Sequence, residues 1–432
     1  MRWHEVYQQK KTDATTAISQ IQSGQSVYIG GGAGVPQTLI NSLMHRSQEL
    51  SDVNLIHVLH FGEAPYSDPK YQNSFRHNAL FIGQNLRGAV QEGRADFTPI
   101  FLSEIPKLFR EGFINLDYAL VHLSPPDEHG FCSFGVEVGS TKPAAETAKM
   151  VIAEINPQMP RVLGDSFIHV RDLDLIIEAD YPIPEAPQGG ASPVHEKIGK
   201  IIAEIIPNGA TLQMGIGSIP DAVLKNLHNH QDLGVHTELF SDGVVDLVEE
   251  GVITGAKKTL HPGKVVAGFL FGSKKLYTFL NDNPIIELHP TDYVNDPFII
   301  AQNNSMISIN SAIQVDLTGQ INACSIGTRF YSGVGGQLDF TRGAARSKGG
   351  KPIIALPSTA KGGKFSRIVP ILNSGAGVTT TRYDVHNVVT EHGIAELYGK
   401  TIRQRVESLI NISAPQFRDE LTKKAKELHY LT

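Results

Sequence analysis

The 432-residue sequence has few cysteines, no surplus of positive charge and no long apolar run. Its two cysteines, Cys132 and Cys324, lie far apart, which excludes a disulfide framework and predicts a reducing location, the cytoplasm. The net charge of −6 leaves no basic excess for nucleic-acid binding. Because residues 1–11 are polar and no run of about 18 apolar residues occurs, neither a signal peptide nor a membrane span is expected.

What the sequence does contain is material for large α/β cores. Apolar residues make up 41% of the chain, and the 41 glycines suit many tight turns between strands and helices. Short β-branched runs alternate with helical patterns, which predicts βα units and mainly parallel sheets. The length favours two or three domains.

An internal repeat sharpens the domain prediction. Residues 23–43 match residues 208–227 when one residue is skipped in a glycine turn. Each copy reads as a β-rich run, a glycine turn and a helix with proline in its first turn, where proline is tolerated. We expect helices before the two copies, over residues 14–21 and 194–205.

A second, weaker match supports the duplication. Residues 127–135 resemble residues 317–327, and both follow predicted strands, over 116–123 and 306–315. The proline- and glycine-rich stretch 181–193 reads as the boundary. The predicted fold class is therefore α/β, with two tandem, similar domains built on open, mainly parallel sheets: residues 1–185 and residues 186–432.

Glu238 is the leading candidate for chemistry. It follows an apolar strand, in the position where α/β sheets place ligands, outside the carboxyl ends of strands. Upstream, Gln-Met-Gly-Ile-Gly-Ser-Ile-Pro (213–220) reads as a strand, a glycine turn and a helix start whose N–H groups could hold an anion. A carboxylate facing such a turn makes a nucleophile beside its own oxyanion stabiliser. A purely structural turn with a solvated glutamate stays the alternative.

Other polar segments allow two readings each. The glycine loop at 332–337 offers oxyanion donors or is a plain turn, and residues 361–364 offer lysines to a phosphate or form a solvated loop. Residues 390–397 are a second acidic site or, as we favour, a strand end, a glycine turn and a helix start.

No metal site is predicted. His57 and His60 are three apart, so on a strand their side chains would point to opposite faces. No cysteine and histidine spacing is typical of zinc.

Five segments together resemble the acetyl-CoA hydrolase/transferase family of class I CoA-transferases, and within it the 4-hydroxybutyrate and butyrate:acetate CoA-transferases. Two tandem CoA-transferase-type domains are the fold that this resemblance implies, in agreement with the repeat. The segments all lie between residues 213 and 397: residues 213–220, 235–243, 309–320, 332–340 and 390–397.

The resemblance also implies roles for individual residues. Glu238 matches the nucleophile that becomes a glutamyl-CoA thioester. The oxyanion hole would be formed by Ile216, Gly217, Gly335, Gly336 and Asn295, with Asn310 as a rival to Asn295. The CoA contacts would be Gly215, Ile216, Gly217, Ser218, Ile219, Ile313, Gly336 and Lys361, with Lys364 as a rival to Lys361.

The implied activity is ping-pong transfer of CoA from acetyl-CoA, or another short acyl-CoA, to a short-chain carboxylate such as 4-hydroxybutyrate or butyrate. CoA would be a substrate, with no permanently bound cofactor, and the family suggests a homodimer or homotetramer. The alternatives are an acetyl-CoA hydrolase on the same scaffold, a sugar-phosphate isomerase, and a non-catalytic metabolite-binding regulator. A NAD dehydrogenase is disfavoured because Pro220 stands where the dinucleotide motif needs its third glycine.

Overall fold

The computed structural model describes residues 2–187, 189–190 and 192–432, and the chain forms two compact units. Unit 1 contains Met1–Ala186 and Val266–Val294, and unit 2 contains Pro187–Val265 and Asn295–Thr432. The first crossing lies beside the predicted boundary at residue 185. The return of residues 266–294 to unit 1 was not predicted, and the division into residues 1–185 and 186–432 stays a prediction.

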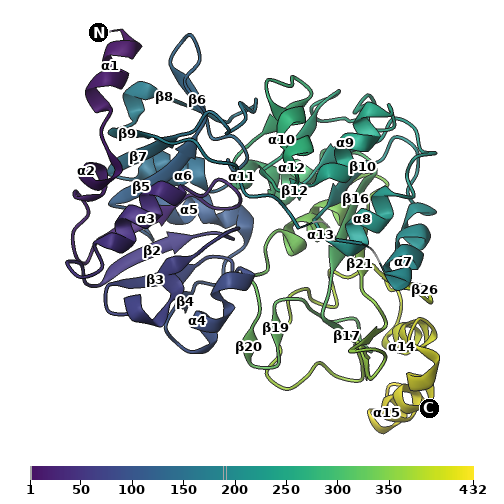
Figure 1. The fold of residues 1–432 in the computed structure, drawn as a ribbon. Helices are drawn as coiled ribbons and strands as arrows, with labels where there is room; N and C mark the ends of the chain where they lie inside the picture. Colours follow the sequence, from purple (N-terminus) through teal and green to yellow (C-terminus); the bar gives the residue numbers. More distant parts are fainter. Residues whose placement is uncertain (1, 188, 191) are drawn as a thin grey trace. The chain divides into compact units, whose positions relative to one another are not determined.

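Unit 1 is built on a seven-stranded sheet with the order β4-β3-β2-β1-β5-β7-β9 (Figure 1). All its neighbouring strands run parallel. All six residues of β5 are buried, as expected for a strand of a parallel sheet covered on both faces. The strands are β1 (Ser26–Ile29), β2 (Val53–His57), β3 (Phe75–Ala79), β4 (Asp96–Phe97), β5 (Tyr118–Leu123), β7 (Met150–Ile155) and β9 (Leu175–Glu178).

The helices of unit 1 cover this sheet through apolar faces. In α3 the buried residues are Leu39, Ile40, Leu43 and Met44, which is the spacing of one helical face. They join side chains of β1, β2 and β3 in one core. The helices are α1 (Trp3–Lys10), α2 (Ala14–Ile18), α3 (Gln37–His45), α4 (Arg87–Gln91), α5 (Ile105–Arg110) and α6 (Thr141–Thr147), and β6 (Phe131–Ser133) pairs with β8 (Phe167–His169).

Residues 266–294 belong to unit 1 through backbone pairing. Glu137 forms an antiparallel bridge with Phe269, and Gly164 forms a parallel bridge with Leu288. Their elements are β14 (Phe269–Leu270), α10 (Lys274–Leu280), β15 (Ile286–Leu288) and α11 (Thr291–Val294), and β13 (Val265–Ala267) spans the crossing.

Within unit 2 the strand order is β11-β10-β16-β21-β25-β26. These strands pair in parallel except β26, which forms an antiparallel hairpin with β25. The strands are β10 (Thr211–Met214), β11 (Gly234–His236), β16 (Met306–Ser311), β21 (Lys351–Ala355), β25 (Asn387–Thr390) and β26 (Gly393–Glu396).

The helices of unit 2 begin at recognisable caps. Ser192 caps α7 and Thr401 caps α14, each through a hydroxyl that accepts a backbone N–H. The helices are α7 (Pro193–Ala203), α8 (Ser218–Leu224), α9 (Asp242–Glu249), α12 (Pro297–Ile300), α13 (Gln337–Arg346), α14 (Ile402–Asn411) and α15 (Arg418–Glu427). Short strands complete it: β12 (Leu239–Phe240), β17 (Gln314–Asp316), β18 (Ile321–Asn322), β19 (Ser325–Ile326), β20 (Arg329–Phe330), β22 (Thr359–Ala360), β23 (Phe365–Ser366) and β24 (Ile368–Val369).

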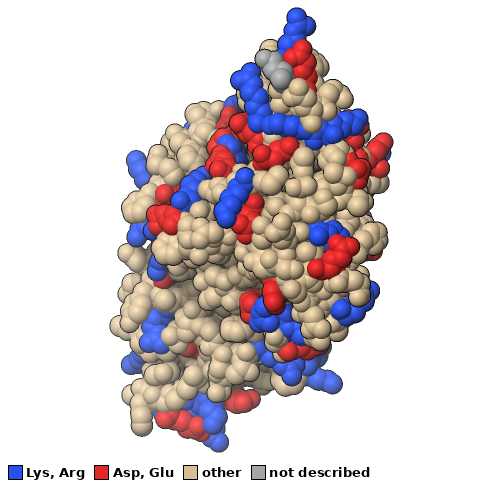
Figure 2. Space-filling model, turned by 90° about the vertical axis from the view of Figure 1, so that its left-hand side faces the viewer, with Lys and Arg blue, Asp and Glu red and all other residues tan. Residues whose placement is uncertain are grey.

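The surface carries charges of both signs. On the face drawn in Figure 2, basic and acidic side chains are interspersed, in keeping with the net charge of −6. Ion pairs such as Lys149–Asp117 at 2.8 Å contribute to this mixture. Among the residues that the structure describes, no helix has the length and apolar character needed to cross a membrane.

The two sheets repeat one topology, as the sequence repeat predicts. In both, the first strand of the repeat lies between the second strand on one side and a later strand on the other: β1 between β2 and β5, and β10 between β11 and β16. Residue 26 pairs with residue 54 in unit 1, as residue 211 pairs with residue 234 in unit 2. When both registers are continued by four residues along the second strand, Val58 in unit 1 corresponds to Glu238 in unit 2. His57 likewise corresponds to Thr237.

Two local expectations were wrong. The single strand predicted over 306–315 is two strands, β16 and β17, because the chain leaves the sheet at the carboxyl end of β16. The helix start favoured after Gly393 is the strand β26, since the glycine turn reverses the chain onto β25.

The reason given against a histidine pair was also wrong. β2 ends at His57, so His60 does not continue the strand, and the two rings lie 6.2 Å apart between centroids. Both side chains are buried.

Candidate active site

The glycine turn after β10 has the predicted form. β10 ends at Met214, and α8 begins at Ser218 with Gly217 as its N-cap. The backbone of Gly217 has a φ of +121°, which side chains other than glycine rarely allow. A Cβ built on Gly215 or Gly217 would meet no atom within 4 Å, so the turn faces open space. Its main chain is therefore accessible to a ligand.

Glu238 lies between β11 and β12 and is partly buried. The Asn295 side-chain amide donates a hydrogen bond from Nδ2 to Glu238 Oε2 over 3.0 Å. A Cβ at position 336 would lie 2.2 Å from the same oxygen and 2.3 Å from Asn295 Nδ2, so a side chain there would displace these two groups. Three residues chosen from the sequence thus meet at one carboxylate.

The electrostatics of this group suit covalent chemistry. Burial raises the pKa of Glu238 to about 7, while hydrogen bonds from Asn295 and the Gly336 N–H act to lower it. A carboxylate that has lost solvent is less stabilised than one in water, even with the donors Asn295 and Gly336. Near neutral pH the group is therefore available as a poorly solvated carboxylate nucleophile.

The two candidate asparagines have different partners. Asn295 is 0% exposed and reaches Glu238 from the segment between α11 and α12. Asn310, at the end of β16, forms a reciprocal amide pair with Gln213, at 3.1 Å and 3.3 Å. Of these two asparagines, only Asn295 therefore forms a hydrogen bond with the candidate nucleophile.

Gly335 and Gly336 lie directly before α13. Gly335 has a φ of +58°, and Gly336 is the N-cap of that ten-residue helix. At this position the Gly336 N–H faces the Glu238 carboxylate and hydrogen-bonds to it. Such groups can stabilise an oxyanion.

The remaining predicted contacts line a separate cavity of about 770 Å³ in unit 2. Ile313 and both rival lysines, Lys361 and Lys364, border it. Among the lining residues that sequence reasoning missed are Arg367, the exposed Phe365, Phe417 and Glu420. With three cations against one carboxylate and two aromatic rings, this cavity suits a ligand with phosphates and a base.

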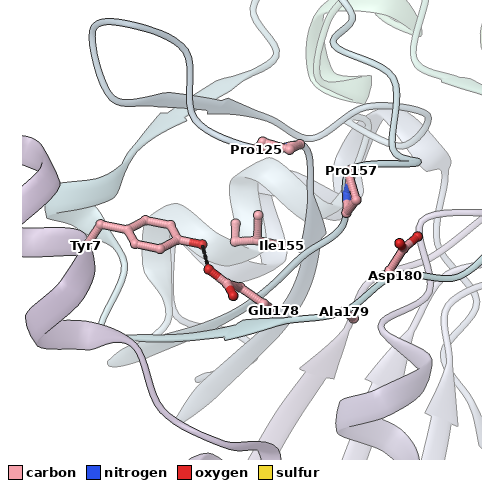
Figure 3. A pocket seen from close by; sticks show the side chains of 7 residues that line it. All are labelled: Tyr7, Pro125, Ile155, Pro157, Glu178, Ala179 and Asp180. Atoms are coloured by element: carbon pink, nitrogen blue, oxygen red, sulfur yellow. Dashed lines mark hydrogen bonds between the residues drawn. The ribbon is translucent and has the colours of Figure 1, made fainter.

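A second cavity, of about 440 Å³, lies in unit 1 at the carboxyl ends of β5, β7 and β9 (Figure 3). Tyr7 donates a hydrogen bond to Glu178 Oε1 over 3.0 Å, and Lys11 pairs with Oε2 of the same carboxylate over 2.6 Å. These contacts tie α1 to β9, so Glu178 has a structural role. The cavity contains none of the residues predicted from the sequence, since its lining is Tyr7, Pro125, Ile155, Pro157, Glu178, Ala179 and Asp180.

Comparison with known proteins places these features in a family. Residues 1–185 match the acetyl-CoA hydrolase/transferase N-terminal domain, and residues 272–425 match the C-terminal domain. The stretch between them includes Glu238 and the Gly215–Ile219 turn.

Several proteins are similar over their whole length. The chain is 51% identical to a 4-hydroxybutyrate coenzyme A transferase of Clostridium kluyveri, over 99% of this chain and 100% of that protein. It is 39% identical to a butyryl-CoA:acetate CoA-transferase of Anaerostipes caccae, over 99% and 98%. The crystal structure of a 4-hydroxybutyrate CoA-transferase from Porphyromonas gingivalis superposes with a TM-score of 0.86 at 43% identity, covering 99% and 100%.

Proposed function

Because the chain belongs to the acetyl-CoA hydrolase/transferase family, we propose that it transfers coenzyme A from acetyl-CoA, or another short acyl-CoA, to a short-chain carboxylate such as 4-hydroxybutyrate or butyrate. The observation that carries the proposal is the Glu238 carboxylate, held by Asn295 and enclosed by Gly336. This arrangement supplies both the nucleophile and the donors that the transfer needs.

The first half-reaction consumes the acyl-CoA. A Glu238 carboxylate oxygen attacks the thioester carbonyl, the carbon–sulfur bond breaks, and CoA leaves as the thiolate, giving an acyl-glutamyl anhydride. The thiolate then attacks the glutamyl carbonyl, a carbon–sulfur bond forms, and the acyl group departs as a free carboxylate with one oxygen from Glu238. The enzyme now carries CoA as a glutamyl thioester, and no proton or external energy source is needed.

The second half-reaction reverses these steps with another acid. The acceptor carboxylate attacks the glutamyl thioester, CoA leaves as thiolate, and the thiolate attacks the acyl carbon of the new mixed anhydride. Glu238 is regenerated as a carboxylate. Two easier displacements replace one difficult exchange, and the kinetics are ping-pong.

Each displacement passes through a tetrahedral oxyanion. We assign its stabilisation to Asn295, to the backbone of Gly335 and Gly336, and to Ile216 and Gly217 of the turn after β10. Losing one such donor typically costs about 10²–10³ in rate. The low dielectric around the partly buried Glu238 strengthens these interactions.

The CoA moiety is assigned to the Gly215–Ile219 turn, Ile313, Gly336 and Lys361. The cavity that holds Ile313 and Lys361 supports this, because Lys364 and Arg367 add positive charge to it. Binding energy from the nucleotide end of CoA is then available to position the thioester at Glu238.

One experiment tests the intermediate directly. The purified enzyme is incubated with acetyl-CoA without an acceptor acid, reduced with borohydride, and digested for mass spectrometry. A glutamyl thioester is reduced to an alcohol, so the peptide with residue 238 should carry that change. An active preparation in which this peptide stays unmodified contradicts the proposal.

The same preparation separates the rival functions. Release of CoA without an acceptor, at the rate seen with one, indicates an acetyl-CoA hydrolase, because water then takes the acyl or glutamyl group. Binding of CoA with neither turnover nor adduct indicates a metabolite-binding regulator. A homodimer or homotetramer stays our prediction for the assembly, and sedimentation velocity measures it.

A further inference from the structure

The hydroxyl group of Thr237 joins the end of β10 to the segment that carries Glu238. Its Oγ1 lies 2.9 Å from the carbonyl oxygen of Met214 and 3.0 Å from that of Leu239, and these two acceptors share its single proton. The same oxygen accepts the N–H of Met214 over 3.3 Å. Thr237 is 1% exposed, so water does not compete for these contacts.

The position of these contacts matters for the site. Met214 is the last residue before the Gly215 turn, and Thr237 and Leu239 stand on either side of Glu238. The pairing of β10 with β11 ends at Leu212 and Val235. Beyond that pair, the Thr237 hydroxyl links the two strand ends where backbone pairing has stopped.

The matching strand ends in unit 1 are joined by the backbone instead. Gly32 and His60 form a parallel bridge beyond β1 and β2, and the Gly32 N–H donates to Leu59 O over 2.6 Å. His57 occupies the position of Thr237 in the register, and neither of its ring nitrogens has a hydrogen-bond partner. The side-chain link is therefore a feature of the unit that holds the candidate nucleophile, where β10 and β11 pair over two residue pairs rather than three.

We propose that Thr237 is a positioning residue for CoA transfer, which fixes Glu238 relative to the N–H groups of the Gly215–Ile219 turn. The carboxylate and these donors must act on the same carbonyl, and an error of about 1 Å in such a geometry can cost about 10² in rate. This inference rests on the proposed function, since it assigns both groups to one reaction.

Three variants test the role. Thr237→Val keeps the shape of the side chain and removes the hydroxyl, whereas Thr237→Ser keeps the hydroxyl. Thr211→Val is the matched control, because Thr211 lies on β10, is 0% exposed, and its Oγ1 has no hydrogen-bond partner.

We expect Thr237→Val to lower kcat about 10- to 100-fold while KM for acetyl-CoA changes by less than about threefold, because a misplaced nucleophile weakens transition-state binding alone. Thr237→Ser should stay within about fivefold of wild type, and Thr211→Val should match wild type. A Thr237→Val enzyme as fast as Thr211→Val, or a Thr237→Ser enzyme as slow as Thr237→Val, overturns the inference.

Two controls keep the outcomes distinct. Melting temperatures of the Thr237 and Thr211 valine variants are compared. If a smaller amount of folded protein accounts for the fall in kcat, the positioning role is also overturned. If Thr237→Val does not fold, Thr237→Cys, with a weak donor of similar size, replaces it. An active Glu238→Ala enzyme sinks the proposed function itself, whereas an inactive Glu238→Ala enzyme with a fully active Thr237→Val enzyme sinks only this inference.

Discussion

Unit 1 and unit 2 use the same sheet for different purposes. The strand order around β1 repeats around β10, but the residues at the carboxyl ends of the strands differ. Where unit 2 has Glu238 after β11, unit 1 has the buried Val58 after β2. Residues within the strands hold the core and preserve the topology, whereas residues just beyond them contribute less to it and are free to diverge toward chemistry.

The polar groups show the same division. In unit 2 the side chains of Thr237 and Gln213 hydrogen-bond across strand ends. In unit 1 the buried His57 and His77 pack around Tyr66, with ring centroids 5.4–5.9 Å from the tyrosine ring. Burial lowers the pKa of both histidines, so they are neutral packing groups at pH 7.

The largest expected effect is on transfer activity, and it distinguishes Glu238 from Val58, the matching residue in unit 1. Glu238→Ala should lower transfer by about 10⁴-fold or more, because no nucleophile remains. Glu238→Asp should lose about 10²-fold through a shorter arm. Initial rates with acetyl-CoA and butyrate measure both.

The control for this prediction is the counterpart in unit 1. Val58→Ala should cost about 2–3 kcal/mol of unfolding free energy through a cavity and leave kcat of the folded enzyme within a few-fold of wild type. If Glu238→Ala retained substantial CoA transfer, Glu238 and Val58 would not differ in catalytic importance.

The next effect concerns the glycine at the carboxylate. Gly336→Ala places a methyl group 2.2 Å from Glu238 Oε2, so either the carboxylate or the helix start must move. We expect a fall of about 10²–10³ in kcat/KM. Gly88→Ala in α4 of unit 1 is the control, since its Cβ would meet nothing within 4 Å and alanine should be neutral or slightly stabilising there. Equal activity of the two variants contradicts the tight fit.

A smaller effect distinguishes the two asparagines. Ionised Glu238 is the reactive form, so the rate should rise with pH through about 7. The Asn295 hydrogen bond lowers the pKa of Glu238, and Asn295→Ala should therefore move this rise to higher pH and reduce the maximal rate about 10-fold or more. Asn310→Ala should leave the midpoint of the pH profile in place, because Asn310 pairs with Gln213. A shift in the Asn310 variant alone would reverse the assignment.

The smallest effect is on stability and tests the packing role of unit 1. His57 has a pKa well below that of an unfolded histidine because of burial, so the unfolded chain binds an extra proton as pH falls below about 6.5. The contribution of His57 to the free energy of unfolding is therefore fully present above that pH and is lost below it. At pH 5 the neutral His57 lowers the free energy of unfolding by about 2 kcal/mol, and at pH 7.5 this penalty is absent. His57→Leu should remove the penalty.

Denaturant unfolding of wild type and variant at the two pH values measures that difference. A His57→Leu difference that does not change with pH would show that His57 is not held neutral.

Much of the frame follows from local sequence. Apolar runs of strand length and glycine turns predicted the βα units and the repeat. The errors occurred where a short polar strand depends on its neighbour. β26 forms because Gly393–Glu396 pairs with β25, and nothing within those four residues favours a strand over a helix start.

The sequence by itself determined the doubled parallel-sheet architecture and singled out Glu238, because periodicity and turn chemistry act over a few residues. Only the tertiary structure decided that Asn295, 57 residues further along, rather than Asn310 donates to that carboxylate, and that a side chain at position 336 would displace it. Such contacts join segments whose separation along the chain carries no local signal. They are set by the packing of α13 against β16 and β21 and of α12 against α13, which brings the segments before these two helices to Glu238.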